Sequence, residues 1–165
     1  MSNKDLLDNI KKLREMTGVG FKDCKLALDE SKGNIEKSIE FLRKKGIAKA
    51  NKRMSRVASE GLVCIGEKEN EFSMIEINCE TDFVAKNQEF INFTEEVSKI
   101  ALSKLGNIEK ILDSEMKNKK SVKNSLVDLI SKIGEKLNFR RSEFVSKEKS
   151  INFSYIHSSI KKNVG

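Results

Sequence analysis

The pattern of apolar residues changes within residues 77–87, INCETDFVAKN, and this change decides how the chain divides into elements. Before the change, apolar and polar side chains alternate, as in a half-buried strand. Beyond it, apolar side chains recur at helical spacing. Asp82 and Phe83 stand side by side at the join, an acid next to a large aromatic.

The residues around this join permit two interpretations. Thr81 or Asp82 could cap a helical turn by accepting hydrogen bonds from the amides of Val84 or Ala85. Phe83 would then be an ordinary core residue. Alternatively, Phe83 is displayed at a junction, where a partner could bury its large apolar surface. The flanking elements are amphipathic without Phe83, which slightly favours display.

Upstream of the join, the sequence predicts an antiparallel hairpin. Residues 61–66, GLVCIG, form a short apolar run between glycines, and residues 72–80, FSMIEINCE, alternate. Ile75, Ile77 and Cys79 fall on one face, so one face of the hairpin is expected to be covered.

Downstream, two strong helices and two strands are predicted. Helical spacing continues to Gly106, and a second helical pattern begins at Val122, with a short helix and a loop expected over 107–121. Residues 138–145, NFRRSEFV, and 150–157, SINFSYIH, have strand patterns. Residues 57–165 are therefore expected to form an α+β subdomain with a small antiparallel sheet and two main helices.

Residues 1–46 are predicted to form a compact three-helix bundle. Glycines end each helical pattern, with Gly46 closing the third, and Ser2 is a candidate N-cap of the first. The expected core comprises Leu6, Ile10, Leu13, Thr17, Phe21, Cys24, Ala27, Leu28, Ile35, Ile39 and Leu42.

Charge is unevenly distributed. Residues 43–56 hold seven basic groups and no acid, whereas residues 61–100 carry 3 basic and 9 acidic side chains. Residues 47–56 are expected to be a basic linker, partly helical at most. A solvated connector is favoured over an electrostatic contact to phosphate or to an acidic protein.

Three cysteines and one histidine limit the kinds of site that the chain could contain. Cys24, Cys64, Cys79 and His157 lack the close pairing that a zinc site needs, and an odd number of isolated cysteines indicates reduced intracellular thiols. Cys79 falls on the apolar face of its strand. We therefore interpret it as a buried, inert thiol rather than a nucleophile paired with His157. His157 is interpreted as a core-edge residue in preference to a functional one.

Other features exclude whole classes of protein. No phosphate-binding glycine motif occurs and no apolar run approaches about 20 residues, so no cofactor, no bound metal and no membrane span are predicted. The N-terminal residues resemble neither a signal nor a transit peptide, which favours a bacterial-type cytoplasmic location.

Several stretches resemble motifs of elongation factor Ts, a family of bacterial and organellar translation factors, in the family's order. Residues 13–46 resemble its N-terminal module. Residues 56–63 (RVASEGLV), 77–87 (INCETDFVAKN) and 133–141 (IGEKLNFRR) resemble motifs of its core, and 155–157 (YIH) resembles the tyrosine-and-histidine motif that follows. The resemblance covers nearly all of the chain.

This resemblance implies a guanine-nucleotide exchange factor for elongation factor Tu that performs no covalent chemistry. It implies a ubiquitin-associated-like fold for residues 1–46, which docks on the partner, and the N-terminal half of the family's core for residues 57–165. Thr81, Asp82, Phe83 and Val84 are implied to enter between helices of the partner and disturb its bound Mg²⁺. Further candidate contacts are Arg14, Thr17, Gly18, Val19, Gly20, Phe21, Ala85 and His157.

The chain also departs from the family pattern. Members usually run longer, with a second core half, and the glycines that usually follow the motif histidine are Ser158 and Ser159 here. We therefore expect a fragment or a naturally short form, with weaker exchange than a full-length factor and an exposed apolar edge.

Two alternative functions remain. The first is a basic RNA- or ribosome-binding module using residues 43–56 and 117–123. Direct nucleic-acid binding is not expected, however, because no aromatic side chains interleave with the basic ones. The second is a thiol enzyme using Cys79.

Overall fold

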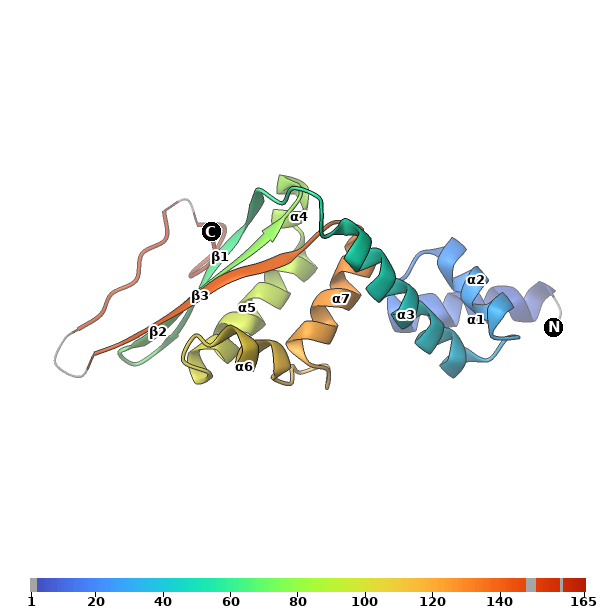
Figure 1. Ribbon diagram of the computed structural model, residues 1–165, viewed down its shortest axis with the longest axis horizontal. Coiled ribbons are helices and arrows are strands. Elements are labelled where there is room, and N and C mark those ends of the chain that lie inside the picture. Colours follow the sequence, from blue (N-terminus) through green and yellow to red (C-terminus); the bar gives the residue numbers. More distant parts are fainter. Residues whose placement is uncertain (1–2, 148–150, 158) are drawn as a thin grey trace. The chain divides into compact units, whose positions relative to one another are not determined.

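The computed structural model describes residues 3–147, 151–157 and 159–165 (Figure 1). Helices and one antiparallel sheet make up its regular structure, which confirms the predicted α+β class. The chain divides into two compact units. One comprises Met1–Ser55 with Val127–Gly134, and the other comprises Arg56–Leu126 with Glu135–Gly165.

The first unit contains the three predicted N-terminal helices, α1 (Asn3–Thr17), α2 (Phe21–Glu30) and α3 (Ile35–Arg53). Their apolar faces meet in a small core formed by Ile10, Leu13, Cys24, Ala27, Leu28 and Leu42. Phe21 is an exception, because it begins α2 beyond the end of this core and is 46% exposed. Its predicted burial was therefore wrong.

Helix α3 does not end at Gly46 as predicted but continues to Arg53. Most of the expected linker, residues 47–56, is therefore helical. Glycine costs only about 1 kcal/mol inside a helix, and no proline follows to stop it. A side chain at Gly46 would collide with that of Ser131, so the glycine permits a close approach here and does not end the helix.

The second unit is built on a three-stranded antiparallel sheet in the order β1 (Glu60–Lys68), β2 (Glu71–Cys79) and β3 (Asn138–Ser146). These strands match the predicted hairpin and the first predicted downstream strand. In the register, Cys64 lies opposite Ile75, and Asn78 lies opposite Asn138. The turns that follow β2 and precede β3 therefore lie at the same end of the sheet.

Helix α5 (Gln88–Ser103) packs on β1 and β2, as Figure 1 shows. Phe90, Val97 and Ala101 are fully buried on its inner face, as their spacing predicted. The approach is close because β1 has no side chain at Gly66, where a Cβ would collide with the carbonyl of Ser98. The short helix α6 (Ile108–Asp113) and helix α7 (Val122–Ile133) follow.

The strand predicted over residues 150–157 is not formed in the described part of that range, 151–157. Ile151, Phe153 and Tyr155 are 78%, 89% and 82% exposed, so the alternation reflects no covered face. Instead, Val63 on β1 exchanges backbone hydrogen bonds of 2.7 and 3.0 Å with Gly165. The predicted N-cap Ser2, the first residue of this predicted strand, Ser150, and Ser158 lie outside the described residues.

Candidate functional site

The turn between β2 and α5 is the best-defined candidate site, and its residues 80–85 are called the Phe83 turn below. It contains one short helix, α4 (Asp82–Ala85). Thr81 is the N-cap, with extended backbone and a hydroxyl that accepts a hydrogen bond of 3.4 Å from the amide of Val84. Of the two predicted caps, Thr81 is therefore the one that caps α4.

The Phe83 turn buries two of its side chains and exposes two. Val84 and Ala85 are each 7% exposed and anchor α4 against the second unit. Phe83 is 81% exposed, so it is no core residue. Because the backbone of this turn is already anchored and capped, burial of Phe83 by a partner would cost side-chain ordering but little further backbone entropy.

Asp82 is exposed beside Phe83 and carries a full negative charge at neutral pH. A hydrogen bond from Lys86, with Nζ 2.8 Å from a carboxylate oxygen, holds the pKa of Asp82 below its usual range. Both side chains are more than half exposed, so this ion pair contributes little to stability. A donor on a partner could replace Lys86 at little cost.

Glu135, which lies between α7 and β3, fixes the start of the Phe83 turn. Its carboxylate accepts hydrogen bonds from the amides of Glu80 and Thr81, at 3.2 and 3.1 Å, and from the Thr81 hydroxyl at 2.7 Å. Glu135 lies in one of the motifs that resemble the family, but no role was assigned to it from the sequence. Local sequence patterns could not predict its contacts, because they join turns that are 54 residues apart in the chain.

A second group of predicted contacts lies in the first unit, at the turn between α1 and α2. The Thr17 hydroxyl donates to the carbonyl of Leu13 at 2.7 Å and accepts from the amide of Val19 at 3.3 Å. Gly18 has a φ of +67°, the left-handed conformation that glycine adopts without strain. Arg14, Gly18, Gly20 and Phe21 are exposed, and Thr17 and Val19 are half-buried.

His157 belongs to neither group, and its interpretation as a core-edge residue was wrong. The side chain is exposed, and its Nδ1 lies 3.0 Å from the hydroxyl of Tyr155. The expected strand is absent at this point of the described chain, so no covered face exists for the imidazole to join.

The three thiols are buried and unpaired, as predicted. Burial, reinforced by the charges of Glu135 and Glu60, raises the pKa of Cys79 to about 12. Such a thiol stays protonated at neutral pH and is a poor nucleophile. The described residues also bring together no three His, Cys, Asp or Glu side chains that could hold a metal ion.

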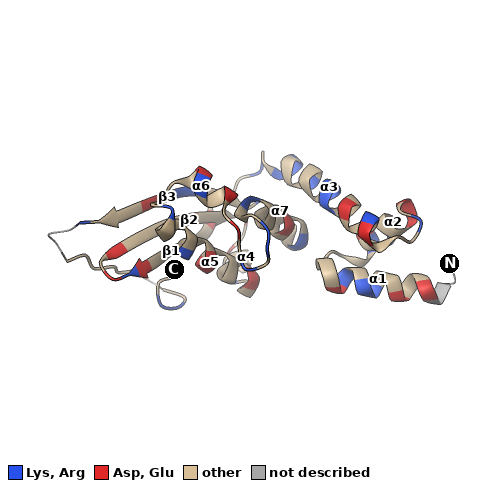
Figure 2. Ribbon diagram, turned by 90° about the horizontal axis from the view of Figure 1, so that it is seen from below, with Lys and Arg blue, Asp and Glu red and all other residues tan. Residues whose placement is uncertain are grey.

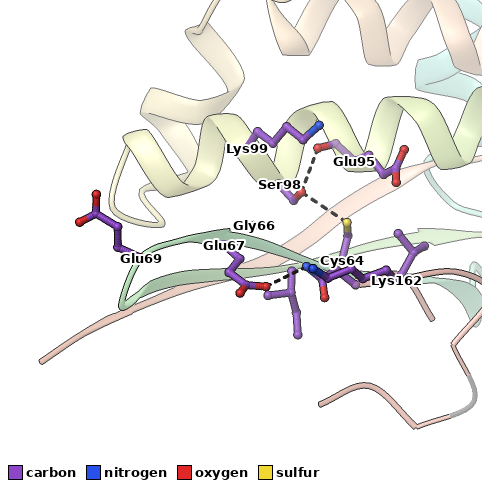
Figure 3. Close-up of a pocket in the computed structure, with 11 residues that line it drawn as sticks. Cys64, Gly66, Glu67, Glu69, Glu95, Ser98, Lys99 and Lys162 are labelled. Carbon is purple, nitrogen blue, oxygen red and sulfur yellow. Dashed lines mark hydrogen bonds between the residues drawn. The ribbon is translucent and has the colours of Figure 1, made fainter. Parts of the chain in front are cut away.

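A polar hollow of about 420 Å³ lies between β1, α5 and the last residues of the chain (Figure 3). Several of its lining groups hydrogen-bond to one another. The Cys64 thiol donates to Ser98 at 3.3 Å, and the Asn163 amide donates to Glu67 at 3.2 Å. Because these groups already pair and the rest of the lining carries charges of both signs, the hollow offers no convergent set for a ligand.

The basic run of residues 43–56 is largely engaged within the chain. Five of its seven basic side chains form ion pairs or hydrogen bonds: Lys44 with Glu40, Lys45 and Lys49 with Asp23, Arg53 with the carbonyl of Ile130, and Arg56 with Glu80. Figure 2 shows that the acidic residues of α3 lie in its first half, ahead of this basic run. Phosphate would have to displace these partners, but the ion pairs are partly or largely exposed and each contributes little. The absence of interleaved aromatic side chains therefore remains the main argument against the RNA-binding alternative.

An exposed aromatic side chain on a capped turn with buried anchor residues is typical of a protein-binding module. Comparisons with known proteins agree on a family. The family model for elongation factor Ts matches residues 80–165, just over half of the chain. The chain is 46% identical over 151 residues to elongation factor Ts of Clostridium perfringens strain SM101, covering 90% of this chain and 50% of the relative.

Two further relatives give the same result. Elongation factor Ts of Methylobacterium nodulans is 41% identical over 157 residues, which covers 94% of this chain and 51% of the relative. That of Clostridium kluyveri is 46% identical over 153 residues, at 90% and 50% coverage. The chain belongs to the elongation factor Ts family, and it spans about half the length of the curated relatives it matches.

No helix in the described part of the chain has the length and apolar character needed to span a bilayer.

Proposed function

We propose that this chain promotes guanine-nucleotide exchange on elongation factor Tu by inserting the Phe83 turn near the partner's nucleotide and Mg²⁺. The observation that carries this proposal is the 81% exposure of Phe83 on a turn that is anchored by the buried side chains of Val84 and Ala85. Family membership supplies the partner, and the display of an aromatic side chain from an anchored turn supports its use as a wedge.

Each residue of the stretch would have its own role. Val84 and Ala85 hold α4 to the second unit, so that insertion does not displace the helix. Phe83 gains stability by burial in an apolar pocket between helices of the partner. The Thr81 hydroxyl caps α4 and thereby holds in place the helix that carries Phe83.

Asp82 would act through its charge. Its carboxylate accepts hydrogen bonds and is ionised at neutral pH, since Lys86 lowers its pKa. In the complex it exchanges Lys86 for polar groups of the partner that otherwise support the Mg²⁺ site. The Mg²⁺ is bound by the partner, and the affinity of the partner for this ion would fall.

Exchange then follows from thermodynamic coupling. If the chain lowers the affinity of the partner for GDP, then GDP lowers the affinity of the partner for the chain by the same factor. The nucleotide-free complex is therefore the tightest state, and incoming nucleotide releases the factor. The exposed residues around Gly18 and Phe21 in the first unit would add affinity without touching the nucleotide.

Stopped-flow release of fluorescently labelled GDP from elongation factor Tu tests this proposal. Unlabelled GDP is added in excess, and the release rate is followed as the concentration of the chain increases. The rate should rise and then saturate. A rate that is no faster with the chain than without it would overturn the proposal.

A further inference from the structure

Two glutamates, called the crossed pair below, link the turn after β2 to the turn before β3, because the carboxylate of each accepts hydrogen bonds from backbone amides of the other turn. Glu135, from the turn before β3, accepts hydrogen bonds from the amides of Glu80 and Thr81. Glu80, from the turn after β2, accepts a hydrogen bond from the amide of Lys136. Each turn therefore ties down the backbone of the other.

A cation joins this arrangement and offsets its negative charge. Arg56 Nη1 lies 3.2 Å from a carboxylate oxygen of Glu80, and Lys136 Nζ donates to the carbonyl of Arg56 at 2.9 Å. Glu80, Glu135 and Lys136 are all only half-buried. Charge-assisted hydrogen bonds of this kind are stronger than neutral ones, which makes the crossed pair suited to holding two turns in register.

The hydroxyl of Thr81 links the crossed pair to Phe83. A hydroxyl has one proton to donate and lone pairs to accept with. Its proton points to Glu135, at 2.7 Å, and its oxygen accepts from the amide of Val84 at 3.4 Å. Glu135 thereby fixes the orientation in which Thr81 caps α4, the helix whose second residue is Phe83.

We propose that Glu135 is a positioning residue that fixes the Phe83 turn for insertion into the partner. This role rests on the proposed exchange function. Glu135 itself need not contact nucleotide or metal. Without its carboxylate, two backbone amides and a hydroxyl lose their acceptor, and the direction of the Phe83 side chain becomes less defined.

The free chain can report on this directly, because it contains no tryptophan. The variant Phe83→Trp places a single tryptophan at the tip of the turn, and excitation at about 295 nm avoids the one tyrosine of the chain. Time-resolved anisotropy then measures nanosecond motion of that side chain. Adding Glu135→Ala should increase the fast component of depolarisation, and Glu135→Gln should give an intermediate value, because its amide oxygen still accepts while its nitrogen cannot.

Glu96→Ala is the matched control. The Glu96 carboxylate also accepts a hydrogen bond from a backbone amide, that of Lys117 at 2.6 Å, but at a place away from α4. This variant should leave the motion of the tryptophan unchanged. Equal motion in the Phe83→Trp chain with and without Glu135→Ala would overturn the proposal, as would an equal increase in the Glu96→Ala control. Circular dichroism confirms that each variant is folded.

Nucleotide release in the otherwise native chain supplies the second measurement. Glu135→Ala should lower the saturating GDP release rate about tenfold and change the half-saturating concentration by less than about threefold, because docking is retained while insertion is impaired. Glu135→Gln should recover part of this rate. An unchanged saturating rate in Glu135→Ala would contradict the positioning role. If the unmutated chain does not accelerate GDP release from elongation factor Tu, the proposed exchange function is refuted. The anisotropy result then still decides whether Glu135 fixes the turn.

Discussion

Replacing Phe83 by alanine separates display from core packing, because the two interpretations predict opposite effects. Phe83 is 81% exposed, so only about a fifth of its roughly 200 Å² is buried in the free chain. At about 25 cal/mol per Å², this burial contributes about 1 kcal/mol. Alanine's better helix propensity offsets about 0.5 kcal/mol of the loss. The melting temperature should therefore fall by no more than about 2–4 °C.

The effect on exchange should be much larger. Burying the remaining area of roughly 160 Å² in a partner would contribute up to about 4 kcal/mol, before the cost of ordering the side chain. Even a third of this changes a rate or an affinity about tenfold. We expect Phe83→Ala to slow GDP release from elongation factor Tu at least about tenfold.

Two controls frame this experiment. Phe90→Ala removes a fully buried phenylalanine from α5 and should cost about 3–5 kcal/mol of stability. Leu105→Ala removes a side chain that is 67% exposed, outside the Phe83 turn, and should change neither stability nor exchange appreciably. A large loss of melting temperature in Phe83→Ala, together with unchanged GDP release, would refute the reasoning.

Three further predictions concern the residues around Phe83. Thr81→Val keeps the shape of the side chain but removes the α4 cap and should cost about 1 kcal/mol in urea unfolding, whereas Thr81→Ser should be nearly neutral; equal losses would contradict a capping role. Lys86→Met frees Asp82 and should leave GDP release at least as fast as before; slower release would show that Lys86 itself contacts the partner. Because folding raises the pKa of Cys79 to about 12, its contribution to stability is complete below about pH 8 and declines as the pH rises through 9 towards 12. Urea unfolding should show this alkaline loss, Cys79→Ala should reduce it, and thiol reagents should label the folded chain only slowly at neutral pH; rapid labelling of Cys79 would contradict the burial.

Much of the fold could be predicted because periodicity reports on local burial. The hairpin, α5 and α7 were predicted from the spacing of their apolar residues, and each of these elements is present in the structure. Gly46 misled the prediction because a glycine that permits close approach looks, in sequence, like one that ends a helix. Residues 151–157 misled it in a different way, because alternation indicates a strand only where a neighbouring strand pairs with it.

The candidate site was only half accessible to the same reasoning. Thr81 was predictable as a cap because its partner, Val84, is three residues away. The sequence left open whether Phe83 is buried or exposed, because a single aromatic residue at a junction is compatible with both. Glu135 could not be assigned a role, because its contacts depend on two distant turns meeting at the end of the β2–β3 pair.

The most direct test of the central claim is the GDP release rate of elongation factor Tu, measured against increasing concentration of the unmutated chain in the presence of Mg²⁺. We predict a rate that rises with concentration and reaches a plateau well above the spontaneous rate. Release that stays at the spontaneous rate at every concentration would contradict the claim that this chain carries a working exchange element.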